Sequence, residues 1–364
     1  MKKKLIIISF LMFFTAVSVF STASQAGMIF LMIYPGARSM AMGGASAALA
    51  DDAYANYYNP AGLGLQDKKD VVLQHVNWLS ELAPDMYYEY FGGTLPTQYG
   101  NFGAEIIYLT TGEAYATDAD DPTGRWMPFD FALSISYAYP ISEKLSVGTS
   151  GKFIYSFLAP EWVVRSYLNE STGGQAQTLA LDLGILYKLN DAVNFGASIS
   201  NIGPEISYLD NPESTDPLPT ALRIGTKYTV FENELNSIML ATDLTKVFAG
   251  SADSMTWGFS PGDLFTRASI IRDGGQDVSA DSVYVTDLEK EILDTWISIG
   301  AEYVYYNLLA VRGGYFIDYW GKRIGYTFGG GLIINNAIRI DIGVDSDIYD
   351  FDTSNYRLSV GFRF

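Results

Sequence analysis

An alternation of apolar and polar residues, running from about residue 70 to the C-terminus, constrains the fold of this chain more than any other feature. Between residues 129 and 139 every odd position is aromatic or aliphatic, and every even position is small or polar. Segments 338–344 and 356–364 alternate in the same way. Successive side chains of a strand point to opposite faces, so each segment has one apolar face and one polar face.

A soluble β-sandwich also alternates, but three features favour a transmembrane β-barrel. The alternating segments run for about 10 to 14 residues, whereas globular strands average about 5 to 6 and tilted membrane strands need about 9 to 11. The chain is 48% apolar and 15% aromatic, yet the apolar residues are dispersed. Aromatic rings at strand ends suit the lipid headgroup level, and such rings are Tyr137, Tyr139, Tyr303, Tyr305 and Tyr356.

The connections between segments indicate the number of strands. Alternating short turns and long loops fit an even-stranded barrel whose termini both lie in the periplasm. Asn, Asp and Ser in the short turns tolerate the backbone angles of tight hairpins. We predict fourteen strands, at residues 69–79, 85–95, 101–112, 128–140, 144–158, 175–189, 192–200, 220–231, 235–248, 294–305, 308–318, 322–334, 337–346 and 356–364. Short turns fall at 142–143, 190–191, 232–234, 306–307 and 335–336, and outer loops at 113–127, 159–174, 201–219, 249–293 and 347–355.

The N-terminus predicts export. Three lysines, Lys2 to Lys4, precede an apolar run from Leu5 to Phe14, which is typical of a signal peptide. Ser24 and Ala26 suit the small side chains required before a cleavage site, which places the signal peptide at residues 1–26. The apolar run is too short for a transmembrane helix, which needs about 20 apolar residues. We therefore expect a mature chain in the bacterial outer membrane.

Charge and composition argue against several functions. A net charge of −18 opposes nucleic-acid binding, which needs clustered Lys and Arg. Without Cys there is no thiolate nucleophile or zinc-thiolate site, and His75 is the sole histidine. No motif around His75 indicates catalysis, and we place it in the lumen or at an interface. We expect no enzyme activity, no cofactor and no catalytic residue.

Residues 27–66 do not alternate and are rich in small side chains, which suits packing in a confined space. A barrel of about fourteen strands is wider than the eight whose side chains fill the interior, so we expect this segment to plug it. Asp51 or Asp52 can cap a short helix that ends before Pro60. The glycine runs 43–44 and 329–331 lack the context of a phosphate-binding loop, and close packing or a sheet bend explains them better.

Residues 36–63, GARSMAMGGASAALADDAYANYYNPAGL, resemble the N-terminal motif of the PorV/PorQ family, a branch of the FadL-like outer-membrane barrels. The resemblance implies an all-β fold: a transmembrane antiparallel β-barrel of about 14 strands over residues 67–364, with an N-terminal hatch at residues 27–66. In FadL-like transporters an Asn-Pro-Ala motif lies in the hatch. The implied hatch residues are Gly36, Ala37, Arg38, Met42, Gly43, Gly44, Asp51, Asp52, Asn59, Pro60 and Ala61.

The C-terminal strand carries a second resemblance. Phe362 and Phe364 lie in register on its apolar face, and a terminal aromatic strand of this kind resembles the signal read by the barrel assembly machinery. The mature protein would then contact outer-membrane lipid and lipopolysaccharide. Acidic loops either hold calcium or are solvated and bridged to lipopolysaccharide by divalent ions; these acids are Asp118, Asp120, Asp121, Asp345, Asp347, Asp350 and Asp352.

Charged residues at the inward-facing positions indicate whether the lumen is plugged or forms a pore. Both signs are present, which favours an ion-paired, plugged lumen over a selective pore with a single-sign constriction ring. Either some of these residues line a substrate path or they only pair with one another. They are Glu105, Lys152, Asp182, Arg223, Lys227, Asp243, Glu302, Arg339, Asp341 and Arg357.

Two functions remain open on the sequence alone. The resemblance implies an accessory barrel of type IX protein secretion, where PorV-like proteins associate with the translocon and receive cargo, or of surface attachment, where PorQ-like proteins act. Its protein partner would contact the outer loops, chiefly residues 249–293 with Trp257, Phe259, Phe265 and Tyr284. The alternative is a FadL-like passive channel that passes a hydrophobic ligand beyond the hatch.

Overall fold

The structure of the chain is a computed structural model. Both the predicted signal peptide up to residue 25 and most of the loop at 249–293 lie outside the residues that it describes. The same is true of Asp118, Asp120, Asp121, Asp347, Asp350 and Asp352. The described residues are 26–49, 51–81, 83–116, 124–168, 170–209, 215–248, 267–269, 284–286, 295–319, 323–345 and 353–364.

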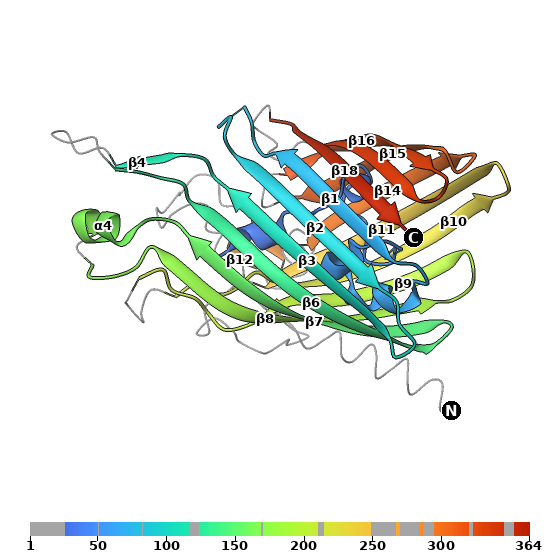
Figure 1. Cartoon of the computed structure of the whole chain (residues 1–364), viewed down its shortest axis with the longest axis horizontal. Helices are drawn as coiled ribbons and strands as arrows, with labels where there is room; N and C mark the ends of the chain where they lie inside the picture. Colours follow the sequence, from blue (N-terminus) through green and yellow to red (C-terminus); the bar gives the residue numbers. More distant parts are fainter. Residues whose placement is uncertain are drawn as a thin grey trace.

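Fourteen antiparallel strands form a closed barrel, which confirms the predicted fold class and strand number. Each strand pairs with its neighbours in the chain, and the first strand pairs with the last. Figure 1 shows the strands wrapping obliquely around the barrel. The barrel strands are β1 Asp70–Asn77, β2 Tyr87–Leu95, β3 Asn101–Thr110, β6 Phe129–Ser142, β7 Leu145–Phe157, β8 Gln175–Lys188, β9 Val193–Ile202, β10 Thr220–Glu232, β11 Asn236–Phe248, β14 Thr295–Tyr305, β15 Leu309–Asp318, β16 Arg323–Ile334, β17 Ile338–Asp345 and β18 Asn355–Arg363.

Tight turns stand where the sequence predicted them. Tyr306 and Asn307 have φ values of 55° and 45°, and Asn335 and Asn336 have values of 52° and 53°. Two consecutive residues at positive φ form the turn that matches the twist of a two-residue hairpin, and Asn tolerates this conformation. These turns fix the register of β14 with β15 and of β16 with β17.

The alternation separates the two faces of the wall. In β6, Ser134 and Ser136 are fully buried, whereas Ile135 between them is 64% exposed. Tyr139 and Tyr356, at opposite strand ends, also point outward and are exposed. An apolar outer surface with aromatic residues near its edges is the arrangement of a transmembrane barrel. Among the described residues, no helix has the length and apolar character needed to cross a bilayer.

Residues 26–49 and 51–66, hereafter the N-terminal segment, form short helical turns next to the inner surface of the wall. The turn α2 lies against β16, β17 and β18, whereas η3 lies against β6, β7 and β8. Figure 1 shows these blue turns among the strands. Most of the segment is buried, because it contacts opposite walls of the barrel. Its elements are η2 Ile29–Met32, α2 Ala37–Met40, α3 Ala55–Tyr58 and η3 Pro60–Leu65.

The outer connections contain structure that the alternation did not predict. The loop predicted at 113–127 projects as a hairpin, and the loop at 159–174 begins with helical turns (Figure 1). A second short hairpin lies within the loop at 249–293. These elements are β4 Ala114–Ala116, β5 Gly124–Trp126, α4 Glu161–Val163, η4 Val164–Leu168, β12 Arg267–Ser269 and β13 Tyr284–Thr286.

Candidate functional site: the N-terminal segment and the inner wall

Glycines of the wall bring the N-terminal segment into direct contact with the strands. At eight inward positions, on eight different strands, an added Cβ would lie within 2.7 Å of an atom of the segment. Such a contact is shorter than real Cβ atoms make, so there is no room for a methyl group between wall and segment. We call these residues the wall glycines: Gly103, Gly148, Gly184, Gly196, Gly300, Gly314, Gly329 and Gly343.

The segment contributes glycines of its own at the tightest approach. Gly43 and Gly44 have φ values of 69° and 85°, a region that side chains disfavour. A Cβ at Gly43 would lie 2.6 Å from the carbonyl oxygen of Tyr315 in β15. The Gly43 amide donates a hydrogen bond of 2.8 Å to the hydroxyl of Thr327 in β16. At Gly43 the segment therefore turns directly against the main chain of the wall, with no side chain between them.

Polar side chains of the wall and of the segment bind main-chain groups where the two meet. Asp243 of β11 accepts hydrogen bonds from the amides of Ser46 and Ala47, at 2.7 and 2.8 Å. Asn59 donates from its side-chain amide to the carbonyls of Ala47 and Ile185, at 2.9 and 3.0 Å. These bonds satisfy backbone groups that a segment without regular structure would otherwise bury unpaired.

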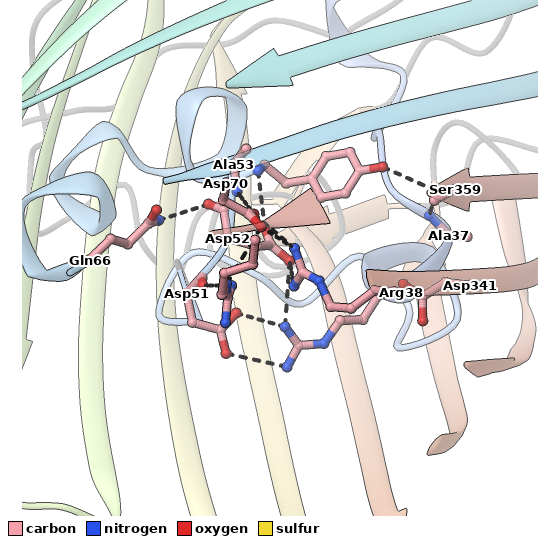
Figure 2. A network of polar contacts seen from close by, with 12 residues as sticks. Ala37, Arg38, Asp51, Asp52, Ala53, Gln66, Asp70, Asp341 and Ser359 are labelled. Atoms are coloured by element: carbon pink, nitrogen blue, oxygen red, sulfur yellow. Dashed lines mark hydrogen bonds and ion pairs between the residues drawn. The ribbon is translucent and has the colours of Figure 1, made fainter. Parts of the chain in front are cut away.

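A continuous ion network joins the segment to five strands. Figure 2 shows the part of it around Arg38, Asp52 and Asp70. Arg38 donates two hydrogen bonds to Glu302 of β14, both at 2.9 Å, and two to Asp51, at 2.6 and 3.4 Å. Asp52 lies 3.5 Å from Arg38 and 3.3 Å from Arg339 of β17, so it links the two guanidinium groups. The paired acidic and basic groups are buried to different degrees, and Arg38 keeps only 13% of its side chain exposed.

The network continues along the wall in both directions. Arg312 of β15 contacts Glu302 and Asp341, both at 2.6 Å. Asp70 of β1 contacts Arg339 at 2.8 Å, and Arg363 of β18 at 3.5 Å. Charge-assisted bonds of this kind are stronger than neutral ones, and a buried charge is tolerated only when it is paired. The mixed lumen charges predicted from the sequence therefore include many paired ones.

Electrostatics keep the central pair charged. Burial would raise the pKa of the Asp51 carboxyl, but the Arg38 guanidinium outweighs it and holds that pKa well below its usual range. Burial would likewise lower the pKa of Arg38, and Asp51 and Glu302 together raise it instead. Both groups are therefore ionised at neutral pH.

An aromatic cluster joins the N-terminal segment to β14 and β15 inside the barrel. Tyr34 makes edge contacts with Tyr58, Trp296 and Phe316, with ring centroids 5.7 to 6.1 Å apart. The guanidinium of Arg223 lies 5.4 Å from the centre of the Tyr34 ring. Aromatic pairs and cation–π contacts of this kind add to the apolar burial. A small cavity of about 20 Å³ lies beside Tyr34, Trp78 and Phe316.

Comparisons with known proteins assign the family. The family model described as type IX secretion system protein PorV matches residues 19–253, more than half of the chain. The chain belongs to the PorV family. No individually curated protein matches the sequence.

Solved structures resemble this PorV-family barrel in fold. The Pseudomonas putida toluene transporter TodX is 16% identical with a TM-score of 0.54, over 90% of this chain and 97% of its own. The Ralstonia pickettii toluene transporter TbuX is 16% identical with a TM-score of 0.52, over 91% and 98%. At this identity the likeness concerns the fold alone. The family and the fold are those of outer-membrane barrels.

The structure brings together most of the residues predicted for the hatch of this PorV-family chain. Met42 is fully buried against Gly300, and Asn59 is fully buried where η3 begins. Asp52 accepts a hydrogen bond from the Tyr54 amide just before α3, whereas the half-exposed Asp51 pairs with Arg38. Gly36, Ala37, Pro60 and Ala61 are buried beside them. The two residues of the predicted assembly signal, Phe362 and Phe364, are exposed on the outward face.

The structure narrows one expectation about a single residue and corrects another. Of the two places expected for His75, the lumen is excluded, because the side chain points outward from β1 and contacts Glu89 of β2 at 2.7 Å; a position at an interface stays a prediction. The inward face of β1 is mixed, because Val72 and Val76 alternate there with the buried Asp70 and Gln74, so the alternation in this strand does not distinguish the faces. Asp345 is no free loop acid, because it is buried and bound by Arg357 at 3.1 Å.

Sequence reasoning missed the partners on the wall. It identified Glu302, Arg339 and Asp243 as inward charges without pairing them with the segment, and it did not single out Asp70 or Arg312. The wall glycines were a signal in the sequence that could have indicated a packed interior segment. They recur at inward-facing positions of successive strands, where a barrel without a packed interior segment would not need them.

Proposed function

We propose that this PorV-family barrel is an accessory protein of type IX-like protein secretion or surface attachment. In this proposal the N-terminal segment, residues 27–66, is a fixed hatch, and a protein partner binds at the outer end of the barrel formed by residues 67–364. The family match supports the secretion context. The observation that carries the proposal is the contact of the segment with eight wall glycines, which leaves no passage between hatch and wall at those points.

The wall near the N-terminus supports the same proposal. Strands β2 and β3 pair from Tyr87 to Leu95 without a register shift, and β3 pairs with β6 in the same continuous way. A kinked strand that opens sideways would have favoured transport of a hydrophobic ligand. Along these strands the hydrogen-bonded ladder is uninterrupted instead.

The outer connections offer a surface for a protein partner. Trp162 of α4 stacks edge-on against Trp126 of β5, with ring centroids 5.9 Å apart, and is 44% exposed. Tyr115 and Tyr167 are exposed nearby along the chain. Exposed aromatic residues of this kind are enriched at protein interfaces. The residues Trp257, Phe259 and Phe265, first expected to contact the partner, lie outside the described residues.

Affinity isolation from the native host tests this proposal. The tagged protein, extracted in mild detergent, should retain a secretion or surface protein that mass spectrometry identifies. Substitution of Trp162 and Tyr167 by Ala should weaken that association, whereas Tyr99→Ala, an exposed tyrosine at a tight turn of the other end, should not. A barrel that is always isolated alone would contradict the proposal.

A second candidate, a FadL-like passive transporter of hydrophobic small molecules, rests on the aromatic cluster. The lining of the small cavity includes Tyr34, Phe316, Met32 and Met40, side chains that suit an apolar ligand, together with the charged Arg323, Asp345 and Arg357. Growth on a long-chain fatty acid or an aromatic hydrocarbon, with and without the gene, separates the two candidates. Equal growth favours the accessory function.

A further inference from the structure

A charged cavity of about 330 Å³ opens at the end of the barrel that carries the tight turns. It lies between the N-terminal segment, represented by Leu49 and Gln66, and the inner faces of β8, β9 and β10. Lys188 and Lys227 are half-buried in its wall, next to Leu186. Because short turns mark the periplasmic side of such barrels, we call this the mouth cavity.

The lysines around this cavity differ from the arginines of the neighbouring ion network. Over the described residues, no hydrogen bond or ion pair engages the side chains of Lys188, Lys227 or the exposed Lys68 at the rim. In a chain of net charge −18, three unpaired cations around one cavity are unexpected. They contrast with Arg38 and Arg339, whose guanidinium groups are fully paired in the adjacent network.

The acidic groups around the cavity do not neutralise these lysines. Asp51 faces Lys227, but its carboxylate is already bound by Arg38 at 2.6 Å. Asp67 and Asp191 are exposed at the rim, where water screens them. Partly buried cations are desolvated, and an incoming anion would recover the interaction that the chain does not supply.

We propose that the mouth cavity binds an acidic segment of a periplasmic polypeptide. Its carboxylates would contact Lys188 and Lys227, and a neighbouring apolar side chain would pack on the partly exposed Leu65, which also lines the cavity. The cavity lies inside the wall, so the headgroup of a membrane lipid, which stays outside the barrel, does not reach it. This site stands at the opposite end from the outer connections, and it does not depend on the partner proposed there.

Fluorescence anisotropy with the mature protein in neutral detergent tests the site. The probe is a labelled peptide of alternating Glu and Leu, and its counterpart has Gln in place of Glu. We expect the Glu peptide to bind and the Gln peptide to bind at least about tenfold more weakly. The double variant K188Q/K227Q should weaken binding of the Glu peptide by about 100-fold, because each lost charge-assisted bond alone accounts for about tenfold.

A matched control removes the same charge at the same end. Lys69 and Lys144 lie at this end but do not line the cavity, so K69Q/K144Q should bind the Glu peptide as the unchanged protein does. Equal losses in the two double variants would overturn the site, as would absence of binding by the unchanged protein. If inorganic phosphate displaces the labelled peptide as effectively as unlabelled peptide does, the cavity is a site for small anions, and the peptide proposal is overturned.

Discussion

Removal of the Arg38 guanidinium should release the N-terminal segment from the wall. Arg38→Ala leaves Glu302 buried with Arg312 as its remaining partner, and leaves Asp51 without its 2.6 Å contact. Breaking a buried ion pair from one side costs about 3–5 kcal/mol. Because Arg312 stays on Glu302, and because Asp51 is half exposed, we expect the lower end, about 3 kcal/mol.

The natural sequence contains no cysteine, so a single thiol can report this release. Ser46 is buried and its hydroxyl has no hydrogen-bond partner among the described residues, which makes Ser46→Cys a mild reporter substitution. If labelling needs the segment to leave the wall, a cost of about 3 kcal/mol should speed maleimide labelling about 100-fold. Arg38→Lys keeps the charge but loses the paired hydrogen bonds, and it should give a smaller increase.

A second substitution tests the reason for the cost. In Arg38→Ala, Glu302 and Asp341 share the single guanidinium of Arg312, which leaves one excess buried negative charge. Adding Glu302→Gln removes that excess, so labelling should be slower than with Arg38→Ala alone. Heat-modifiable migration on gels would verify that each barrel is folded. A labelling rate that stays within threefold of the reporter protein in a folded Arg38→Ala barrel would refute the role assigned to the network.

Three further predictions follow from the same contacts. Gly314→Leu should prevent assembly of heat-modifiable barrel, whereas Gly313→Leu, one residue along the strand and facing outward with no atom within 4 Å, should assemble normally. Because the pKa of Asp51 is lowered in the folded protein, its stabilising contribution is complete above the ordinary value of 3.8 and is lost as the pH falls below it. Labelling of the Ser46→Cys reporter with an acid-tolerant disulfide reagent should therefore accelerate only below about pH 4. Phe364→Ala should reduce the yield of folded outer-membrane barrel severalfold in cell fractions without changing the stability of the barrel that does assemble, and an unchanged yield would remove its role as an assembly signal.

Much of the barrel could be predicted from the sequence, because its cause is local. A strand that separates lipid from a polar interior must alternate, and segment 129–139 shows this within eleven residues. Hairpin turns are local too, so Asn335 and Asn336 marked a turn without knowledge of the partner strands. These features require only short-range steric and solvation arguments.

The interior could not be predicted in the same way, because its contacts join distant parts of the chain. Glu302 could be placed on the inner face from alternation, but its pairing with Arg38 depends on how the segment lies across the barrel. Glycine fits either face of a strand, so Gly314 and Gly313 look alike in the sequence although one touches the segment and the other faces outward. The β4–β5 hairpin was missed because its strands are only three residues long.

The ion network also spans the line where the barrel closes. Asp70 belongs to the first barrel strand, β1, and lies beside the N-terminal segment. Two arginines contact its carboxylate: Arg363 from the last strand, β18, and Arg339 from β17. Docking of the segment and joining of the two edge strands are therefore coupled events. The N-terminal segment, which is the part of the mature protein synthesised first, can complete its contacts only after the last strand has been made. A sheet that lacks this strand therefore has neither the β1–β18 pairing nor a fully bound N-terminal segment.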